Sequence, residues 1–289
     1  MADRPPASAD TDRIGPTAHY TAYIWHRLGL PYAEYFATRR GAALYWGLLA
    51  LGEWVTRLLP AVPSMRQHLE ARHRLIDAVV LRLRPGCVVE IGAGLTPRAV
   101  AWAADKGVPG IELDLPGMAA AKRRRLARLP AGLQKRLEGR HEVRALDVLA
   151  PGFGERLTAR LSRYRRPVVV AEGLLSYFDA PARRQVLCGV VQALRAVGGG
   201  TMVCSLHTAA AQARVGRAAQ VLRAAQRGIT RRRMPAPYAD LDAIERVFEA
   251  AGFDHCHEAH GPDYADLEPR LARLRSVVHV IVGRVEPRG

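Results

Sequence analysis

Lysine is scarce in this sequence of 289 residues, aromatic residues make up only 6% of it, and cysteine occurs four times. The net charge of +16 therefore comes almost wholly from arginine, whose runs at 123–125, 165–166 and 231–233 are scattered along the chain. A nucleic-acid-binding surface would more often gather its charge beside exposed aromatics. We therefore expect a solvated basic surface and no nucleic-acid partner, although such a surface also suits an anionic small molecule.

No pair of cysteines has C-x-x-C spacing, and the start of the chain has no apolar leader. The absence of paired spacing disfavours a disulfide framework and a cysteine metal site. The absence of a leader disfavours a signal peptide. We expect reduced thiols in a cytoplasmic protein; the four cysteines are Cys87, Cys188, Cys204 and Cys256.

One apolar run, at 42–62, is nearly long enough to span a bilayer. It contains Glu53 and Arg57, which are spaced as an exposed helical pair would be, and charges inside a membrane span are energetically expensive. The run is therefore expected to be a buried or lid helix, and we expect no membrane partner.

Three segments with different patterns follow one another along the chain. Residues 1–16, rich in Pro, Ala, Ser and Asp, are expected to be a disordered tail. Residues 17–84 have a helical pattern, broken at 29–31 and 60–63, and are expected to form an N-terminal helical lid and substrate region. Residues 85–289 are expected to form the catalytic domain, with an Ala/Arg-rich helical insertion at 208–236.

After Pro85, short apolar runs alternate with segments of helix-forming residues. This alternation predicts an α/β fold with a mostly parallel sheet. The last two runs have no long helix between them, which predicts an antiparallel edge. The expected strands are 87–91, 110–113, 143–146, 168–171, 201–206, 253–258 and 277–282, and the expected helices are 97–106, 116–129, 154–162, 180–196 and 240–251.

The first strand is followed by a glycine turn that contains Gly92, Ala93 and Gly94. Parallel sheets bind ligands at the carboxyl ends of their strands, and glycine there lets the backbone approach a ligand closely. A dinucleotide would require G-x-G-x-x-G, but Pro97 stands in the third glycine position. S-adenosylmethionine (SAM) has no phosphate and needs only the first close approach. Glu90, just before the turn, is expected to orient the turn or the ammonium group of SAM.

Acidic residues also end the next strands. Glu112 and Asp114 share one face of the second strand by its period of two, and Asp114 is nearer the carboxyl end. We therefore predict that Asp114 accepts hydrogen bonds from the ribose hydroxyls of SAM. Asp147 ends the third strand, where adenine would lie, and Glu172 ends the fourth beside the switch point; strand-end acids also often cap helices.

Four segments together resemble the leucine carboxyl methyltransferase family, and most closely its bacterial, tetracenomycin-like branch of polyketide-type O-methyltransferases. The segments are VVEIGAGLTPR, IELDLPGMAAAKRRRL, ALDVLAP and VVVAEGLLSYF, and the N-terminal TAHYTAYIWHRLGL is also similar. The most specific pieces are E-x-D-x-P-x₅-K, which ends at Lys122, and A-E-G-x-x-x-Y, which ends at Tyr177. The resemblance covers roughly residues 17–285.

The resemblance implies a class I SAM-methyltransferase fold, a Rossmann-like sheet of seven strands with an N-terminal helical lid. It implies that the glycine turn flanks the methionine part of SAM, that Asp114 and Leu115 hold the ribose, and that Asp147 and Val148 hold the adenine. It places Glu172 near the amino-acid end of SAM. It also implies that Arg72 pairs with the SAM carboxylate; a surface helix arginine is the alternative.

The sequence departs from the eukaryotic members of the family at Thr96-Pro97, where they carry Asp-Thr. This departure favours a small-molecule substrate over a phosphatase tail. A carboxylate acceptor needs no general base, whereas a phenol usually needs one. His207, at the end of the fifth strand, is the candidate base or substrate contact, and Tyr177 is a candidate for placing the substrate. The oligomeric state is not determined by these patterns.

These patterns predict a SAM-dependent O-methyltransferase of secondary metabolism, and two other functions fit them less well. An NAD(P)-linked oxidoreductase is disfavoured by Pro97, and a non-catalytic SAM-binding protein by the retention of Glu90, Asp114 and Glu172. No metal is expected, because the histidines at 255, 257 and 260 lie on an edge strand far from the glycine turn.

Overall fold

The structure is a computed structural model that describes residues 15–50, 65–213 and 235–288. Most of the expected tail, the second half of the apolar run at 42–62 and most of the insertion at 208–236 lie outside these residues.

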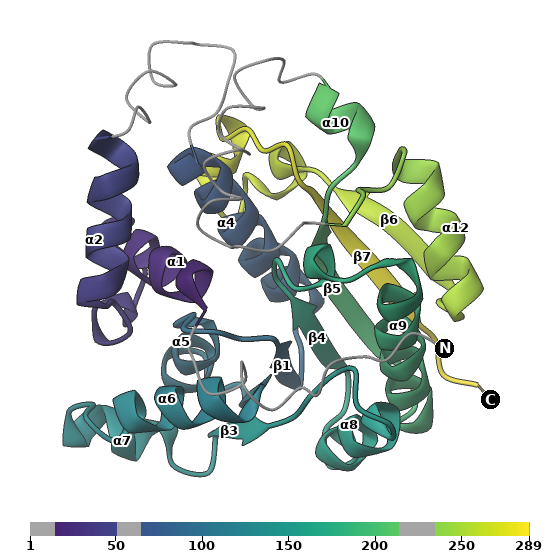
Figure 1. Ribbon diagram of the computed structural model, residues 1–289. Helices are drawn as coiled ribbons and strands as arrows, with labels where there is room; N and C mark the ends of the chain where they lie inside the picture. The colour runs from purple at the N-terminus through teal and green to yellow at the C-terminus, as the bar shows by residue number, and fades with distance from the viewer. Residues whose placement is uncertain (1–14, 51–64, 214–234, 289) are drawn as a thin grey trace, which may run out of the picture.

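Seven strands form one sheet in the order β3-β2-β1-β4-β5-β7-β6 (Figure 1). Five strands are parallel, and β7 runs antiparallel between β5 and β6. The predicted α/β class, the seven strands and the antiparallel edge are therefore confirmed. The strands are β1 (Cys87–Ile91), β2 (Gly110–Asp114), β3 (His141–Ala145), β4 (Pro167–Ala171), β5 (Gly200–Leu206), β6 (His255–Ala259) and β7 (His279–Val285).

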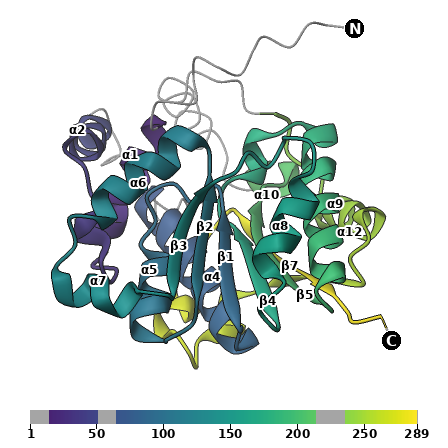
Figure 2. The same ribbon diagram turned by 90° about the horizontal axis from the view of Figure 1, so that it is seen from below.

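Helices cover both faces of the sheet (Figures 1 and 2). One face packs against α8 (Phe153–Leu161), α9 (Ala180–Ala196) and α12 (Leu241–Ala251). The other packs against α4 (Met65–Leu83) and α5 (Arg98–Asp105). All five residues of β1 and of β4 are buried, as expected for central strands of a parallel sheet that is covered on both sides.

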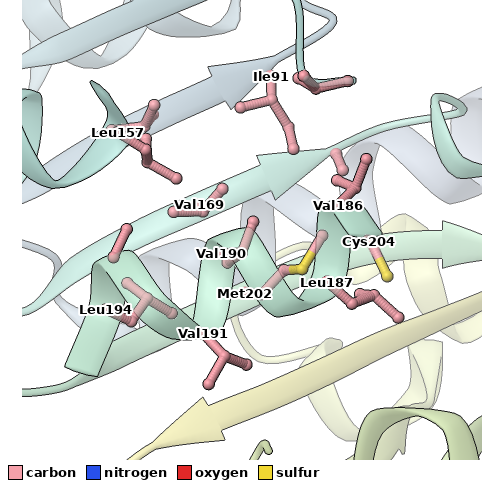
Figure 3. Close-up of a cluster of buried hydrophobic side chains, with 14 of the residues drawn as sticks. Ile91, Leu157, Val169, Val186, Leu187, Val190, Val191, Leu194, Met202 and Cys204 are labelled. Carbon is pink, nitrogen blue, oxygen red and sulfur yellow. The ribbon is translucent and has the colours of Figure 1, made fainter. Parts of the chain in front are cut away.

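The larger core cluster lies between the sheet and α8, α9 and α12, and includes Val89 and Ile91. Figure 3 shows the apolar side chains of α9 directed at the strands. The ends of the covering helices follow from local chemistry. Asp240 caps α12 by accepting from Ala243 N at 2.8 Å, and Gly252 ends it with a φ of +99°.

The N-terminal helices α1 (Pro16–Arg27) and α2 (Arg39–Leu48) form a separate layer beside α5, α6 (Pro116–Leu126) and α7 (Ala131–Leu137) (Figure 1). The two helices cross closely at Gly41, where a Cβ would lie 2.1 Å from the carbonyl oxygen of His19. The short helix α10 (Ala209–Ala213) follows β5. The chain also forms short 3₁₀ helices, which are η1 (Ala33–Tyr35), η3 (Leu175–Tyr177), η4 (Gly261–Tyr264) and η5 (Pro269–Ala272).

The helices differ from the sequence prediction after β2. The helix expected over 116–129 ends at Leu126, and α7 was not expected; Pro130, which has no backbone N–H, separates the two. The helix that contains the start of the apolar run at 42–62 begins at Arg39, because Thr38 caps it by accepting from Gly41 N. Among the residues that the structure describes, no helix is long and apolar enough to cross a membrane.

Candidate functional site

Strand parity brings the predicted acids to one side of the sheet. Val89 and Ile91 face α8 and α9, so Glu90 between them faces α4. Val203 of β5 faces α4. His207 lies four residues later and therefore faces the same side by the same alternation. The carboxyl ends of β1, β2, β4 and β5 therefore present their polar side chains to one region, the candidate site.

The glycine turn adopts the conformation that its residues predict. Gly92 and Gly94 have φ angles of +65° and +57°, which glycine adopts without steric cost. A Cβ on Gly92 would lie 2.7 Å from the side chain of Leu174, whereas one on Gly94 would meet only Ala18 of α1, at 3.7 Å. The Leu174 side chain thus occupies the space beside Gly92, whereas the backbone at Gly94 stays open apart from Ala18.

Asp114 contacts the turn directly. Its Oδ2 accepts from Gly94 N, and its Oδ1 accepts from Leu115 N, each at 2.7 Å. Burial raises the pKa of this carboxyl above its ordinary value, although the two backbone N–H groups act in the opposite direction. Each oxygen keeps a second lone pair that a ligand hydroxyl can use.

Glu112, the other acid of β2, is enclosed instead. Its Oε2 lies 2.6 Å from the Nζ of Lys122, and its Oε1 lies 3.0 Å from the Nε2 of His141. Lys122 also donates to the carbonyl oxygen of Thr96 and lies 4.7 Å from the ring centre of Phe36. Burial alone would raise the pKa of Glu112, but Lys122 and His141 outweigh it and lower the pKa. Glu112 therefore has no oxygen directed at a ligand, which agrees with the preference for Asp114.

Arg98, which sequence reasoning did not single out, is fully buried at the centre of the site. Its Nη1 lies 2.7 Å from Glu90, its Nη2 2.7 Å from Glu172 and its Nε 2.5 Å from Asp77. These three acids come from β1, the end of β4 and α4, so one guanidinium joins three elements. Arg98 ends the segment VVEIGAGLTPR and begins α5. A charged residue in the first turn of a mostly apolar helix was the signal in the sequence that could have identified it.

Glu90 is committed to this network. Its carboxylate accepts from the Thr96 hydroxyl at 2.9 Å in addition to Arg98. Burial raises the pKa of Glu90, with Arg98 opposing the effect. Of the two roles that the sequence allowed, these contacts support orientation of the turn rather than contact with an ammonium group.

Glu172 is held by three partners from the α4 side. Its Oε1 lies 2.9 Å from Arg72 Nε, and its Oε2 lies 2.9 Å from His73 Nδ1 and 2.7 Å from Arg98. Burial alone would raise the pKa of Glu172, but His73, Arg98 and Arg72 together hold it well below its ordinary value. His73 also stacks on Trp25 of α1 at 4.4 Å between ring centres, so the N-terminal layer contacts the site through this histidine.

The other predicted residues lie around the same edge. Asp147 accepts from Leu149 N at 2.9 Å, and Val148 is buried. Ala93 is buried within the turn, and Leu115 is 38% exposed. Tyr177, at the end of η3, is 37% exposed.

His207 faces a second histidine that the sequence did not suggest. The ring centre of His68, on α4, lies 6.2 Å from that of His207, and the ring planes are inclined by 32°. The Nδ1 of His68 lies 3.1 Å from the Oγ of Ser276, which also accepts from Val278 N. A cavity of about 130 Å³ lies beyond Ser276, lined also by Arg72 and Glu258.

Because His68 is buried, we expect the folded protein to lose stability in acid. Burial lowers its pKa well below 6.5, and Arg72 and His207 act in the same direction. The folded state therefore resists protonation, and unfolding free energy is lost as the pH falls from about 6.5 toward the lowered value. His19, whose pKa burial also lowers, contributes in the same window.

We expect urea denaturation of the His68→Asn variant to show a smaller loss of unfolding free energy between pH 7.5 and 5.5 than the wild type shows. Asn keeps a polar group near Ser276 but binds no proton. The exposed His255→Asn variant should follow the wild type. Equal pH dependence in all three proteins would show that His68 titrates normally in the fold.

His255 of β6 and His260 just after it lie near acidic side chains. His255 lies 3.4 Å from Glu286, and His260 lies 3.9 Å from Glu258. Within the described part of the chain, no three His, Cys, Asp or Glu side chains gather closely enough to hold a metal ion.

The sheet order with β7 inserted antiparallel, the glycine turn after β1 and the acid at the end of β2 define a class I SAM-dependent methyltransferase fold. Residues 29–191, more than half of the chain, match the leucine carboxyl methyltransferase family, and the chain belongs to that family. It is thus a SAM-dependent methyltransferase, not an NAD(P)-linked oxidoreductase, and SAM is its cofactor.

Solved structures agree on the fold. The chain is similar to a proposed methyltransferase from Thermobifida fusca, with 16% identity, a TM-score of 0.54, and coverage of 99% of this chain and 100% of that one. It is also similar to an O-methyltransferase family protein from Burkholderia thailandensis, with 17% identity, a TM-score of 0.52, and coverage of 98% and 75%. At these identities the likeness shows the fold alone.

A proposed O-methyltransferase from Nostoc punctiforme has 18% identity and a TM-score of 0.49, and the match covers 75% of this chain. The chain spans 56% of the length of that protein. No curated protein gives a significant match.

Proposed function

We propose that this chain is an O-methyltransferase that transfers the methyl group of SAM to a small-molecule carboxylate or phenolic hydroxyl, in the bacterial, polyketide-type branch of its family. We further propose that it acts in the cytoplasm on secondary metabolites. The observation that carries the proposal is the contact of Asp114 with the glycine turn, because it sets a carboxylate and an open backbone side by side at the carboxyl edge.

The contacts support a division of roles along the cofactor. Gly92, Ala93 and Gly94 would flank its methionine part, with the approach at Gly94, where a Cβ would meet only Ala18, at 3.7 Å. Asp114 would accept the ribose hydroxyls, with Leu115 beside it. Asp147 and Val148 are proposed for the adenine.

Arg72 is proposed to pair with the carboxylate of SAM. Its Nε is bound to Glu172, so Glu172 acts near the amino-acid end by orienting Arg72. The amino groups of Arg72 are directed past Gly173, where a Cβ would lie 3.3 Å from Nη1. A planar guanidinium with one edge fixed presents its other edge to an anion. The donor set therefore fits the cofactor.

When bound, SAM supplies an electrophilic methyl group whose transfer needs in-line alignment of the acceptor oxygen. The acceptor would lie near the ends of β4 and β5. His207 is proposed there as a base or substrate contact, and the exposed Tyr177 as a substrate-placing residue. The basic balance of the chain suits an anionic acceptor.

Replacing Asp114 with alanine tests the cofactor site. The loss of hydrogen bonds to the ribose should weaken SAM binding by roughly 1–3 kcal/mol, which is about 5- to 150-fold in Kd. Titration calorimetry with SAM and S-adenosylhomocysteine measures the effect. Asp242→Ala, at an exposed position on α12, is the control and should bind as the wild type does. Unchanged affinity in Asp114→Ala would refute the ribose assignment, and absence of binding to the wild type would refute the proposed function.

A further inference from the structure

We propose that His68 is a positioning residue that holds His207 as the proton acceptor, and that the methyl acceptor is therefore a hydroxyl, phenolic or enolic, rather than a carboxylate. This inference rests on the proposed function and decides between its two acceptor classes. It depends on the paired imidazoles between α4 and the end of β5, a feature that the cofactor site does not use.

His68 is buried and is anchored by Ser276. It lies on α4 one turn before Arg72, and it is 8% exposed. Ser276 holds its Nδ1, and Ser276 is itself tied to the start of β7 through Val278 N. The ring centre of His207 lies 6.2 Å from that of His68, and the two ring planes are inclined by 32°. A buried ring that is anchored in this way provides a fixed surface against which a more accessible ring can be oriented.

The charges that face the pair come from three elements. Arg72 on α4 and Glu172 after β4 both act on His68, and His207 itself acts from the end of β5. Thr208, next to His207, contacts His279 Nε2 at 2.9 Å, and His279 contacts Glu258 at 2.6 Å. Arg72 and burial together favour a neutral His68, because a second buried cation beside the guanidinium would be costly.

A neutral His68 beside His207 suits one of the two acceptor classes. With a hydroxyl acceptor, the O–H proton moves to His207 as the new O–CH₃ bond forms and the C–S bond breaks, and the C–S electron pair remains on sulfur. One positive charge leaves the sulfonium and one appears on the imidazole, so the net charge of the site is unchanged. With a carboxylate acceptor no proton is released, so a proton-accepting His207 held by His68 would have no role.

The pairing can be tested without an acceptor. In the full-length protein bound to S-adenosylhomocysteine, NMR of ¹⁵N-labelled histidine rings follows the titration of His68. His207→Asn should raise the pKa of His68, because the neighbouring imidazole is one of the groups that lower it. His255→Asn, on the far edge strand, is the control and should leave it unchanged. A His68 titration that is the same in His207→Asn and wild type overturns the pairing.

The acceptor class is tested with matched probes. We expect the wild type and SAM to convert 2-naphthol and 4-nitrophenol to methyl ethers, detected by mass spectrometry, and not to esterify 2-naphthoic or 4-nitrobenzoic acid. His207→Asn should slow methylation of 2-naphthol by at least about 100-fold. His68→Asn should slow it by about 10- to 100-fold through misplacement of His207. Methyl esters, or no methyl ether from either phenol, overturn the hydroxyl assignment.

Two comparisons separate this inference from simpler explanations. A merely structural role of His68 would slow both phenols equally, whereas loss of proton acceptance should harm 2-naphthol more than 4-nitrophenol, which ionises readily by itself. SAM affinity should be unchanged in both variants, as calorimetry would show. Esterification with normal SAM binding would defeat only this inference, whereas failure to bind SAM would defeat the proposed function.

Discussion

Replacing Arg98 with methionine is expected to lower the unfolding free energy by about 3–5 kcal/mol, because it removes one partner from a buried ion-pair network. The guanidinium is fully enclosed and bonded to Glu90, Glu172 and Asp77. Without it, two carboxylates that are almost wholly buried lose their strongest shared cation, and the folded state must hold them uncompensated or protonate them.

Urea denaturation of the full-length protein measures this loss. Arg144→Met is the matched control, since Arg144 is 54% exposed and its pair with Glu142 is 3.3 Å long. An exposed pair of this kind contributes at most about 1 kcal/mol. If Arg98→Met and Arg144→Met proved equally stable, the buried network would not hold β1, β4 and α4 together.

The same substitution should also affect the cofactor site. Glu172 binds Arg72 through one oxygen and Arg98 and His73 through the other, so loss of Arg98 is expected to shift the carboxylate that holds Arg72. The network therefore links stability to the orientation of the guanidinium proposed to bind the SAM carboxylate.

Replacing Lys122 with methionine should cost a similar amount, about 3–5 kcal/mol. Lys122 and Glu112 are each 1% exposed and lie 2.6 Å apart. Methionine can pack on the Phe36 ring that the Lys122 ammonium faces, but it leaves Glu112 without Lys122 and with His141 as its remaining close partner. The expected loss thus comes from an unpaired buried carboxylate rather than from lost packing.

A double-mutant cycle separates these causes. Glu112→Met combined with Lys122→Met should recover much of the stability, because apolar replacement of a whole buried pair is often neutral or stabilising. Arg136→Met provides the exposed comparison, since Arg136 and Asp105 are 51% and 37% exposed. A double variant no more stable than Lys122→Met would mean that packing, and not the charge of Glu112, sets the loss.

Local patterns in the sequence were sufficient for the strands and the cofactor turn. The central strands β1, β4 and β5 are short apolar runs, and the period of two placed Glu112 and Asp114 on one face of β2. Positions 92 and 94 require glycine because their backbone φ angles are positive. These features depend on residues within a few positions of one another, so they can be read without knowledge of the packing.

The helices were less completely determined. The short α7 was not foreseen, because seven residues after Pro130 carry too few apolar positions to show a period. The expected lid over 17–84 includes α4, which packs directly on the sheet through Ile76, Val79 and Val80. An apolar helical face indicates burial but does not state which layer buries it.

The sequence by itself determined the α/β class, the glycine turn, the acid at the end of β2 and the cofactor, because each follows from local spacing. Only the tertiary structure decided that Arg98 joins Glu90 to Glu172, that Lys122 closes off Glu112, and that His68 meets His207. Those partners lie far apart in the chain. These contacts depend on the orientation and position in which α4, α5 and α6 pack on the sheet. Side-chain packing across the whole core sets that orientation and position.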